Sequence, residues 1–402
     1  MVQPWMENTT MEGVTRRELL SARVRAIKPS GIRKFFDIAA AMPNVISLGV
    51  GEPDFVTPDH IRQAGIASIQ AGQTHYTSNW GALELREALS AYLNRRYDVT
   101  WSPQNEIMIT VGVSEAIDAT LRAVIDPGDE VIIPDPGYVA YEADVTLSGG
   151  VVVPVTTHVE DQFEIKAAAI EAALTPRTKV ILLGNPNNPT GSVIARAELE
   201  KIADLARCHD LLVISDEVYS RLVYGEEHAS IAALPGMKER VVLVDGFSKA
   251  YAMTGWRVGY ICADAHLLEA VLKVHQYAIM SAPTMSQFAA LEAITHGEDD
   301  VLAMVADYNE RRKLTVEGFN SIGLTCYEPR GAFYAFPSIA ATNLTSDQFA
   351  EGLLREYEVA VVPGSAFGEA GEGFIRCTYC AARDKIEQAI ERMGQFVQAH
   401  RA

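Results

Sequence analysis

The chain has 402 residues, 48% of them hydrophobic, with a net charge of −18 and a pI of about 5.0. This length is too great for one compact core, so a large and a small domain, or two similar domains, are expected. An acidic surface repels nucleic acid and anionic membranes, and no run reaches the ~20 apolar residues of a membrane-spanning helix, so neither partner is expected.

The N-terminus and the cysteines predict a cytoplasmic protein. The first twenty residues are polar and mixed in charge, without the apolar stretch of a signal peptide, and residues 1–24 are predicted to form a loose tail or arm. Five cysteines are few and odd in number, which favours a reducing compartment. Cys377 and Cys380 lack a second pair or a histidine at zinc spacing, so packed thiols are expected and no metal site.

The middle of the chain alternates short apolar runs with amphipathic helical segments. The predicted strands are 106–111, 131–133, 151–155, 179–183, 211–215 and 241–244, and helices are predicted over 114–123, 165–174 and 196–209. Continuous apolar runs are typical of strands buried on both faces, and their alternation with helices predicts a mostly parallel α/β sheet.

After about residue 300 the pattern changes to that of a smaller α+β unit. A charged helix is predicted at 301–322 and is followed by an aromatic stretch at 330–336. A further helix comes next, and then short strands at 359–362 and 374–378. The loop at 49–55 reads as part of the same unit. The predicted division is a small domain of 25–60 and 301–402 and a large domain of 61–300.

Lys249 is the first candidate for chemistry. It lies among small and aromatic residues after a predicted strand, and Arg257 follows it. Apolar neighbours and a nearby cation both lower the pKa of a lysine, which makes its amine a nucleophile near neutral pH. The alternatives are a surface lysine and, for Arg257, a surface ion pair.

Further candidates follow the C-terminal ends of predicted strands, where ligands bind in open α/β sheets. Gly112, Val113 and Ser114 stand at a strand-to-helix junction, where backbone N–H groups favour an anion. The alternative is a plain turn with Ser114 as the helix N-cap. Asn188 begins an Asn-Pro-Thr-Gly turn, which by itself is a common turn signal.

Two predicted buried charges need partners. Asp216 ends an apolar strand, where a carboxylate is costly unless it is paired, and a helix N-cap is the alternative role. Arg376 lies between Ile375 and Cys377 on a strand that reads as buried, so it is expected to have an anionic partner. A substrate carboxylate held bidentately is one candidate, and a structural Asp or Glu is the other.

Four motifs occur together in one order: Gly51-Glu-Pro-Asp-Phe55, Asn188-Pro-Thr-Gly191, Ser215-Asp-Glu-Val-Tyr219, and Ser248-Lys249 with Arg257. In these motifs the chain resembles the class I/II aminotransferases of pyridoxal-phosphate (PLP) fold type I, from residue 21 to the C-terminal helix. The resemblance implies a large domain with a mostly parallel seven-stranded sheet flanked by helices, and a smaller α+β domain. It also implies the cofactor PLP and a homodimer with shared active sites.

The resemblance assigns a role to each candidate. Lys249 would form the Schiff base with PLP and later move the α-proton, Asp216 would pair with the pyridine nitrogen, and Tyr219 and Asn188 would bond the ring 3′-oxygen. Tyr138 would stack on the ring, unless it is a core aromatic. The phosphate would be held by Gly112, Val113, Ser114, Ser248 and Arg257, with Tyr76 reaching over from the partner subunit.

Substrate contacts are assigned to Arg376, Asn188, Ile32 and the backbone of Gly51, although a simple turn glycine is the alternative at Gly51. Two departures from the family concern Gly246, where many relatives carry a hydroxyl, and Tyr138, where aspartate-specific enzymes often have tryptophan. No clear match exists for a second arginine that reads a dicarboxylate. Arg33 and Arg330 are candidate substitutes, and the alternatives are that they are ordinary surface charges or that Phe36, Phe333 and Tyr334 form an aromatic pocket.

The predicted function is a ping-pong aminotransferase. An L-amino acid, with aspartate or aromatic donors favoured and alanine or diaminopimelate-type donors open, gives its amino group to 2-oxoglutarate by way of pyridoxamine phosphate. A β-eliminating C–S lyase on the same fold would share every cofactor residue. An effector-sensing regulatory module would need an appended DNA-binding domain, which the N-terminal tail is too short to supply.

Overall fold

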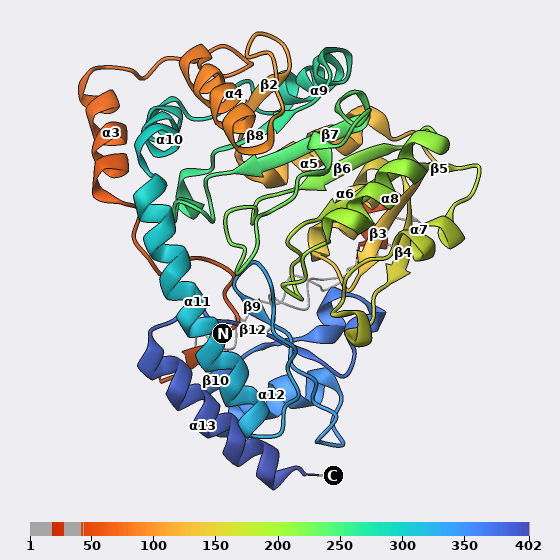
Figure 1. Cartoon of the computed structure of the whole chain (residues 1–402), viewed down its shortest axis with the longest axis vertical. Coiled ribbons are helices and arrows are strands. Elements are labelled where there is room, and N and C mark those ends of the chain that lie inside the picture. The colour runs from red at the N-terminus through yellow and green to blue at the C-terminus, as the bar shows by residue number, and fades with distance from the viewer. Residues whose placement is uncertain (1–17, 28–41, 43, 402) are drawn as a thin grey trace, which may run out of the picture.

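The centre of the computed structural model, which describes residues 18–27, 42 and 44–401, is a seven-stranded sheet (Figure 1). Its strands lie in the order β2 (Ile107–Thr110), β8 (Gly259–Cys262), β7 (Val241–Gly246), β6 (Leu212–Asp216), β5 (Thr178–Gly184), β3 (Glu130–Asp135), β4 (Val151–Thr156). All neighbours are parallel except β8, which runs antiparallel to both β2 and β7. The prediction of a mostly parallel sheet is confirmed, and β8 is a strand that the sequence analysis missed.

Helices cover both faces of this sheet. One face packs against α5 (Gly112–Val124), α6 (Val139–Ser148) and α9 (Ala265–Ala278). The other packs against α3 (Asp59–Gln70), α4 (Leu83–Tyr97), α7 (Ala167–Ala173), α8 (Arg196–Cys208) and α10 (Thr284–His296). The sequence of β5 is apolar because both of its faces are buried. Val180 and Leu182 pack into one core, and Ile181 and Leu183 pack into the other.

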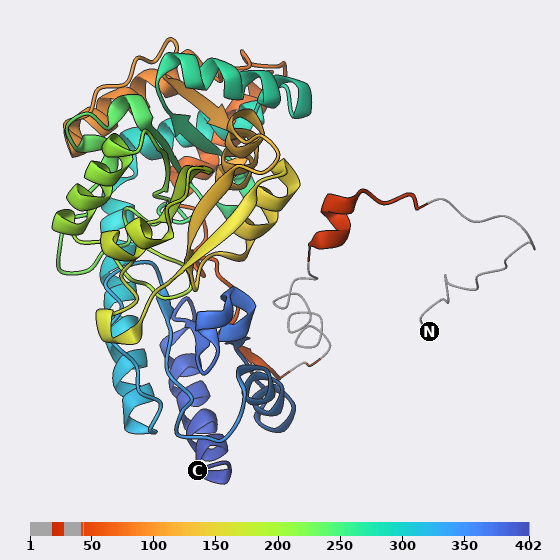
Figure 2. The same ribbon diagram turned by 90° about the vertical axis from the view of Figure 1, so that its right-hand side faces the viewer.

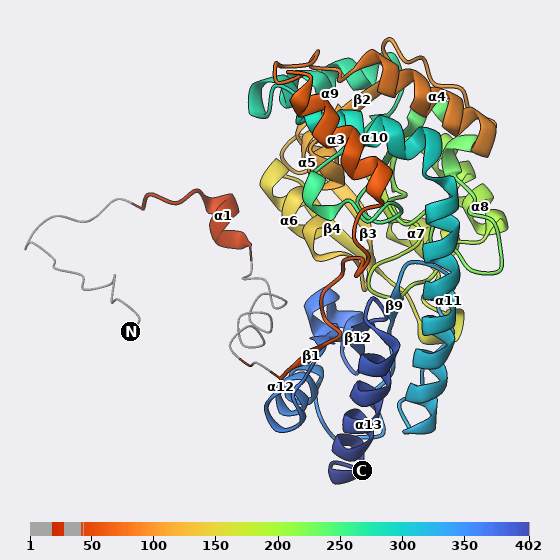
Figure 3. The ribbon, with the colours of Figure 1, turned by 90° about the vertical axis from the view of Figure 1, so that its left-hand side faces the viewer.

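A second group of elements forms its own core below the large sheet in Figure 1. It contains β1 (Ile46–Ser47) paired with β10 (Val359–Ala360), the sheet β11 (Val362–Pro363), β12 (Ile375–Thr378) and β9 (Tyr334–Ala335), and the helices α12 (Ser346–Tyr357) and α13 (Arg383–Ala399). Helix α11 (Glu298–Ser321) runs along both groups, as Figure 3 shows. The predicted domain boundaries stay a prediction, because this helix contributes to both cores.

Three local features differ from, or add to, the sequence analysis. Helix α5 begins at Gly112, so Ser114 lies inside its first turn and is not the N-cap. Residues 22–26 of the predicted N-terminal tail and small domain form helix α1 (Ala22–Ala26), where Arg23 donates to the Leu147 carbonyl at 3.0 Å. Figure 2 shows α1 at the side of the main body. The five cysteines are free thiols, and no helix in the described residues is long and apolar enough to cross a membrane.

Candidate active site

A cavity of about 570 Å³ opens at the C-terminal edge of the large sheet. The predicted residues that line it are Gly51, Val113, Ser114, Tyr138, Asn188, Asp216, Tyr219, Ser248, Lys249, Arg257 and Arg376. Gly112 lies directly before this lining. Tyr76 lies outside it with an exposed fraction of 80%, and Ile32, Arg33 and Phe36 fall outside the described residues.

Lys249 follows β7 and points its amine at the loop before α3. Its Nζ donates to the Gly51 carbonyl at 2.7 Å and lies over the rings of Phe333 and Tyr219, at 5.6 and 5.8 Å. Burial lowers the pKa of Lys249 from 10.5 to about 8, and the positive charges of Arg376 and Arg257 act in the same direction. This is the direction that the apolar sequence context predicted.

Asp216 ends β6 inside the cavity. Its Oδ2 accepts a hydrogen bond from Tyr141 at 2.8 Å, and its Oδ1 accepts one from the Val218 backbone at 3.2 Å. Burial raises the pKa of this carboxyl to about 6, and both hydrogen bonds oppose the rise. Tyr141 was not identified from the sequence, although it stands three positions after Tyr138 on α6, on the same face of the helix.

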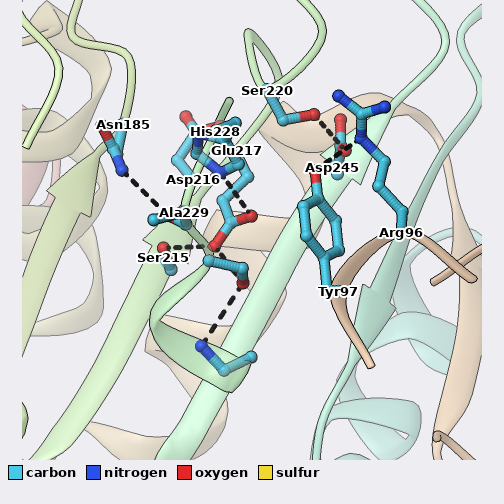
Figure 4. Close-up of polar contacts among 12 residues, drawn as sticks. Arg96, Tyr97, Asn185, Ser215, Asp216, Glu217, Ser220, His228, Ala229 and Asp245 are labelled. Atoms are coloured by element: carbon cyan, nitrogen blue, oxygen red, sulfur yellow. Dashed lines mark hydrogen bonds and ion pairs between the residues drawn. The ribbon is translucent and has the colours of Figure 1, made fainter. Parts of the chain in front are cut away.

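Two further buried carboxylates lie behind Asp216 (Figure 4). Glu217 accepts hydrogen bonds from Ser215, Ser230 and His228, at 3.0, 2.7 and 2.9 Å. Asp245, on the neighbouring strand β7, accepts bonds from Ser220, Tyr260 and the Gly246 backbone. The cavity wall is therefore supported by a polar network that is satisfied largely within the protein.

Arg257 and the start of α5 form a cradle for an anion. The Arg257 guanidinium donates to the carbonyls of Thr254 and Val111, at 3.1 and 3.5 Å. Gly112 has a φ of +73°, and a Cβ there would stand 2.6 Å from Nη2 of Arg257, so only glycine allows this approach. No carboxylate of the described residues pairs with Arg257, which contradicts the surface ion-pair alternative.

Arg376 is buried on β12, with an exposed fraction of 4%. Its guanidinium donates to Asn188 Oδ1 at 2.9 Å and to the Gly49 carbonyl at 2.7 Å. It lies between the rings of Tyr334 and Phe367, at 4.5 and 4.8 Å. Within the described part of the chain it has no carboxylate partner and its Nε has no hydrogen-bond partner. The alternative of a structural Asp or Glu partner is therefore wrong for the described residues.

The hydroxyl oxygens of Tyr219 and Tyr334 are 2.8 Å apart. Tyr334 lines the cavity, as one of the aromatic alternatives predicted, whereas Phe333 packs behind Lys249. A Cβ at Gly51 would lie 2.3 Å from the Tyr334 hydroxyl. Gly51 is therefore not simply a turn glycine, because any side chain there would clash with Tyr334.

The other sequence candidates have structural roles. Arg330 pairs with Glu226 at 3.2 Å and does not line the cavity, so it is wrong as the dicarboxylate-binding arginine. A Cβ at Gly246 would stand 3.1 Å from the Cα of Gly259 on β8, so this close strand pairing favours glycine.

Comparisons with known proteins bear on this arrangement. The family model described as aminotransferase class I and II matches residues 43–393. The chain belongs to this family. A putative aminotransferase of Bacillus subtilis is 55% identical over 378 residues, covering 94% of this chain and 98% of the relative. An aspartate aminotransferase of Pyrococcus abyssi is 45% identical, with coverage of 94% and 98%.

A solved aromatic aminotransferase from Pyrococcus horikoshii superposes on this aminotransferase with a TM-score of 0.87, at 43% identity and coverage of 91% and 99%. The protein is therefore a PLP-dependent transaminase of PLP fold type I. Its cavity fits PLP in charge. The cradle of Arg257 and the α5 N-terminus suits a phosphate, and the buried Asp216 carboxyl suits a protonated ring nitrogen.

Proposed function

We propose that this aminotransferase moves the α-amino group of an L-amino acid, either aspartate or an aromatic one, to 2-oxoglutarate in a ping-pong cycle. The observation that carries the proposal is Arg376, a buried cation with no carboxylate partner among the described residues. It stands beside the amine of Lys249 across the Gly49–Gly51 backbone. A bidentate α-carboxylate would pair with Arg376 and bring the substrate Cα toward Lys249.

PLP, when bound, supplies an electron sink for charge that develops at the substrate Cα. The chain's own residues supply the rest. Lys249 is the proposed covalent anchor, and its released amine would move the α-proton of the substrate to C4′ of the cofactor. Asp216 would pair with the protonated ring nitrogen, and Tyr141 keeps the Asp216 carboxylate in place.

The phosphate is assigned to Gly112, Val113, Ser114, Ser248 and Arg257, and the ring face to Tyr138. Asn188 is assigned a double role. It accepts from Arg376 through Oδ1, and its amide nitrogen is left to donate to the ring 3′-oxygen. Tyr219 is the second group assigned to that oxygen.

Donor choice depends on the outer wall of the cavity. Besides the two arginines assigned above, its described lining includes the apolar Val50, Ile117 and Val139, the aromatic Tyr334, and the carboxylates Glu52 and Asp144. No third arginine among the described residues lines the cavity to pair with a side-chain carboxylate, which favours an aromatic donor. The aspartate aminotransferase of Pyrococcus abyssi keeps aspartate as the second donor to be tested.

We also propose a cytoplasmic homodimer with shared active sites. Tyr76 and Tyr277 have exposed fractions of 80% and 87%, and Ile69 and Met280 are exposed as well. Exposed large apolar side chains near the C-terminal ends of α3 and α9 favour an interface there. Tyr76 is assigned to the phosphate in the partner subunit. Free thiols and the acidic composition support the cytoplasmic location.

The test is the absorbance spectrum of the holoenzyme with excess L-tyrosine or L-aspartate and no oxo acid. Loss of the band of the lysine-linked cofactor, with pyridoxamine phosphate and one oxo acid formed per site, supports transamination and ranks the two donors. With L-cysteine as the substrate instead, release of pyruvate, ammonia and sulfide without pyridoxamine phosphate would identify the β-eliminating lyase. A band that persists with both donors would remove both from the proposal.

A further inference from the structure

Tyr334 lies where the two halves of the cavity meet. Its ring packs against the Arg376 guanidinium at 4.5 Å, and its hydroxyl is 2.8 Å from the hydroxyl of Tyr219. We propose that Tyr334 is a positioning residue that couples Tyr219, the partner of the cofactor ring oxygen, to Arg376, the partner of the substrate carboxylate. This inference rests on the roles proposed above for Tyr219 and Arg376.

The hydrogen bond between the two tyrosines has a preferred direction when a ring oxyanion is present. Within the described residues each hydroxyl has the other as its hydrogen-bond partner. If Tyr334 donates, the Tyr219 oxygen accepts and its own proton remains free to be donated into the cavity. Hydrogen bonds in such a chain strengthen one another, so the Tyr334 hydroxyl makes Tyr219 a better donor to the 3′-oxygen.

The position of the Tyr334 ring is fixed from several sides. Phe333 and Tyr219 contact it edge-on, with ring centroids at 4.9 and 5.8 Å. The missing Cβ of Gly51 leaves the space in which its hydroxyl lies. The same packing therefore fixes the ring contact with Arg376 and keeps the Tyr334 hydroxyl facing Tyr219.

Two substitutions separate the two contacts of Tyr334. Tyr334→Phe keeps the ring on Arg376 and removes the hydroxyl, whereas Tyr334→Leu removes both. The first readout is the pH titration of the visible band of the lysine-linked cofactor without substrate. A weaker donor to the ring oxygen disfavours its anionic form, so the midpoint in Tyr334→Phe should rise by about 0.5 to 1 pH unit.

The second readout is the KM of the amino donor. Tyr334→Phe should leave it within about twofold of the wild type, and Tyr334→Leu should raise it about tenfold, because the ring contact with Arg376 is lost. Tyr224→Phe is the matched control. Tyr224 is also buried, but its hydroxyl donates to the Ala332 carbonyl and it does not line the cavity. It should change neither readout.

The double variant Tyr219→Phe/Tyr334→Phe tests whether the hydroxyl acts through Tyr219. Its midpoint should equal that of Tyr219→Phe alone, since the two hydroxyls form one chain. Additive shifts, an unchanged midpoint in Tyr334→Phe, or equal KM changes in Tyr334→Phe and Tyr334→Leu would overturn the coupling. If Tyr219→Phe itself left the midpoint unchanged, the role of Tyr219 in the proposed function would fail as well.

Discussion

Lys249 is partly buried beside the rings of Phe333 and Tyr219, with two arginines nearby, and these surroundings set the fraction of its amine that is uncharged. Its pKa of about 8 means that a substantial share of the amine is neutral at physiological pH, whereas an ordinary lysine at 10.5 would be almost wholly charged. The residue is thus prepared for attack on a carbonyl before any ligand arrives.

The rate at which the cofactor-free protein forms the visible band with PLP should follow this titration. We expect the rate to rise with pH and level off above a midpoint of about 8, because only the neutral amine is nucleophilic. Stopped-flow absorbance after mixing with PLP at a series of pH values measures it. A midpoint near 10.5 would show that the surroundings do not act on Lys249 as described, and Lys249→Ala should form no band.

Substitution of Arg376 by lysine should raise the KM values of both the amino donor and the oxo acceptor about 30- to 100-fold. A lysine cannot grip a carboxylate bidentately, and both substrates carry the same α-carboxylate. Steady-state kinetics of both half-reactions measure the change. Arg312→Lys is the control, because Arg312 is also buried and also lies over a ring, that of Tyr224 at 4.9 Å. A rise for only one substrate would contradict the assignment.

At the scale of residues, the motif order was enough to place Lys249, Asp216, Asn188 and Arg376 at one cavity. The partners of these residues were harder to predict. For Arg376 an anionic partner was expected, either a substrate carboxylate or a structural Asp or Glu, because the cost of burying a guanidinium does not say which group offsets it. Here the Gly49 carbonyl, Asn188 and two aromatic rings relieve that cost, and the first lies more than 300 positions away in the chain.

Helix α5 carries the anion cradle at its first residue, so the local backbone there matters more than a side chain. Gly112→Ala should weaken PLP binding about tenfold or more, since the new Cβ would push Arg257 away from the helix end. Gly128→Ala is the matched control, with a φ of +96° and no atom within 4 Å of the new Cβ. Titration of both cofactor-free variants with PLP, followed by absorbance, separates loss of the cradle from simple backbone strain. Equal affinities would refute the cradle.

The buried carboxyl of Asp245 links β7 to Tyr260 on β8 and to Ser220 in the turn after β6, and burial raises its pKa from 3.8 to about 8. Between these two values the folded protein keeps a proton that the unfolded chain has lost. The free energy of unfolding contributed by this group is therefore fully present below about pH 4 and decreases as the pH rises toward 8.

Asp245→Asn removes this titration, and the amide can make similar hydrogen bonds. We expect the variant to be more stable than the wild type at pH 8 by at least about 1 kcal/mol, with the difference shrinking toward pH 4. Urea unfolding at several pH values measures it. Asp210→Asn, at a surface carboxylate with 94% of its side chain exposed, is the matched surface variant. A constant difference across the pH range would contradict the titration.

At the scale of elements, strand positions could be predicted because β3, β5, β6 and β7 are apolar on both faces. Strand β8 was missed because it is only four residues long and directly follows the motif around Lys249 and Arg257. Helix α6 was not predicted either, and with it the pairing of Tyr141 with Asp216. Periodicity locates an element but does not say which neighbour its side chains meet.

In the whole molecule, the proposed dimer makes one strong prediction. A Lys249→Ala subunit still has Tyr76, and a Tyr76→Ala subunit still has Lys249. If Tyr76 serves the partner's site, refolding an equal mixture should create hybrid dimers with one intact site each, so about a quarter of all sites should be intact. Activity at limiting PLP measures this recovery. A mixture no more active than its two parents would show that Tyr76 does not act across an interface.

The residues that line the cavity are spread along the chain, and this determines the order in which parts of the site are translated. The proposed cofactor contacts from the same chain lie between Gly112 and Arg257, whereas Arg376 lies on β12, close to the C-terminus. A chain emerging from the ribosome has Lys249 and the phosphate cradle translated well before Phe333 and Arg376. A stalled or truncated product would therefore lack both the proposed carboxylate-binding group and part of the surroundings that lower the pKa of Lys249, so the last quarter of the chain completes the amine and the substrate site together.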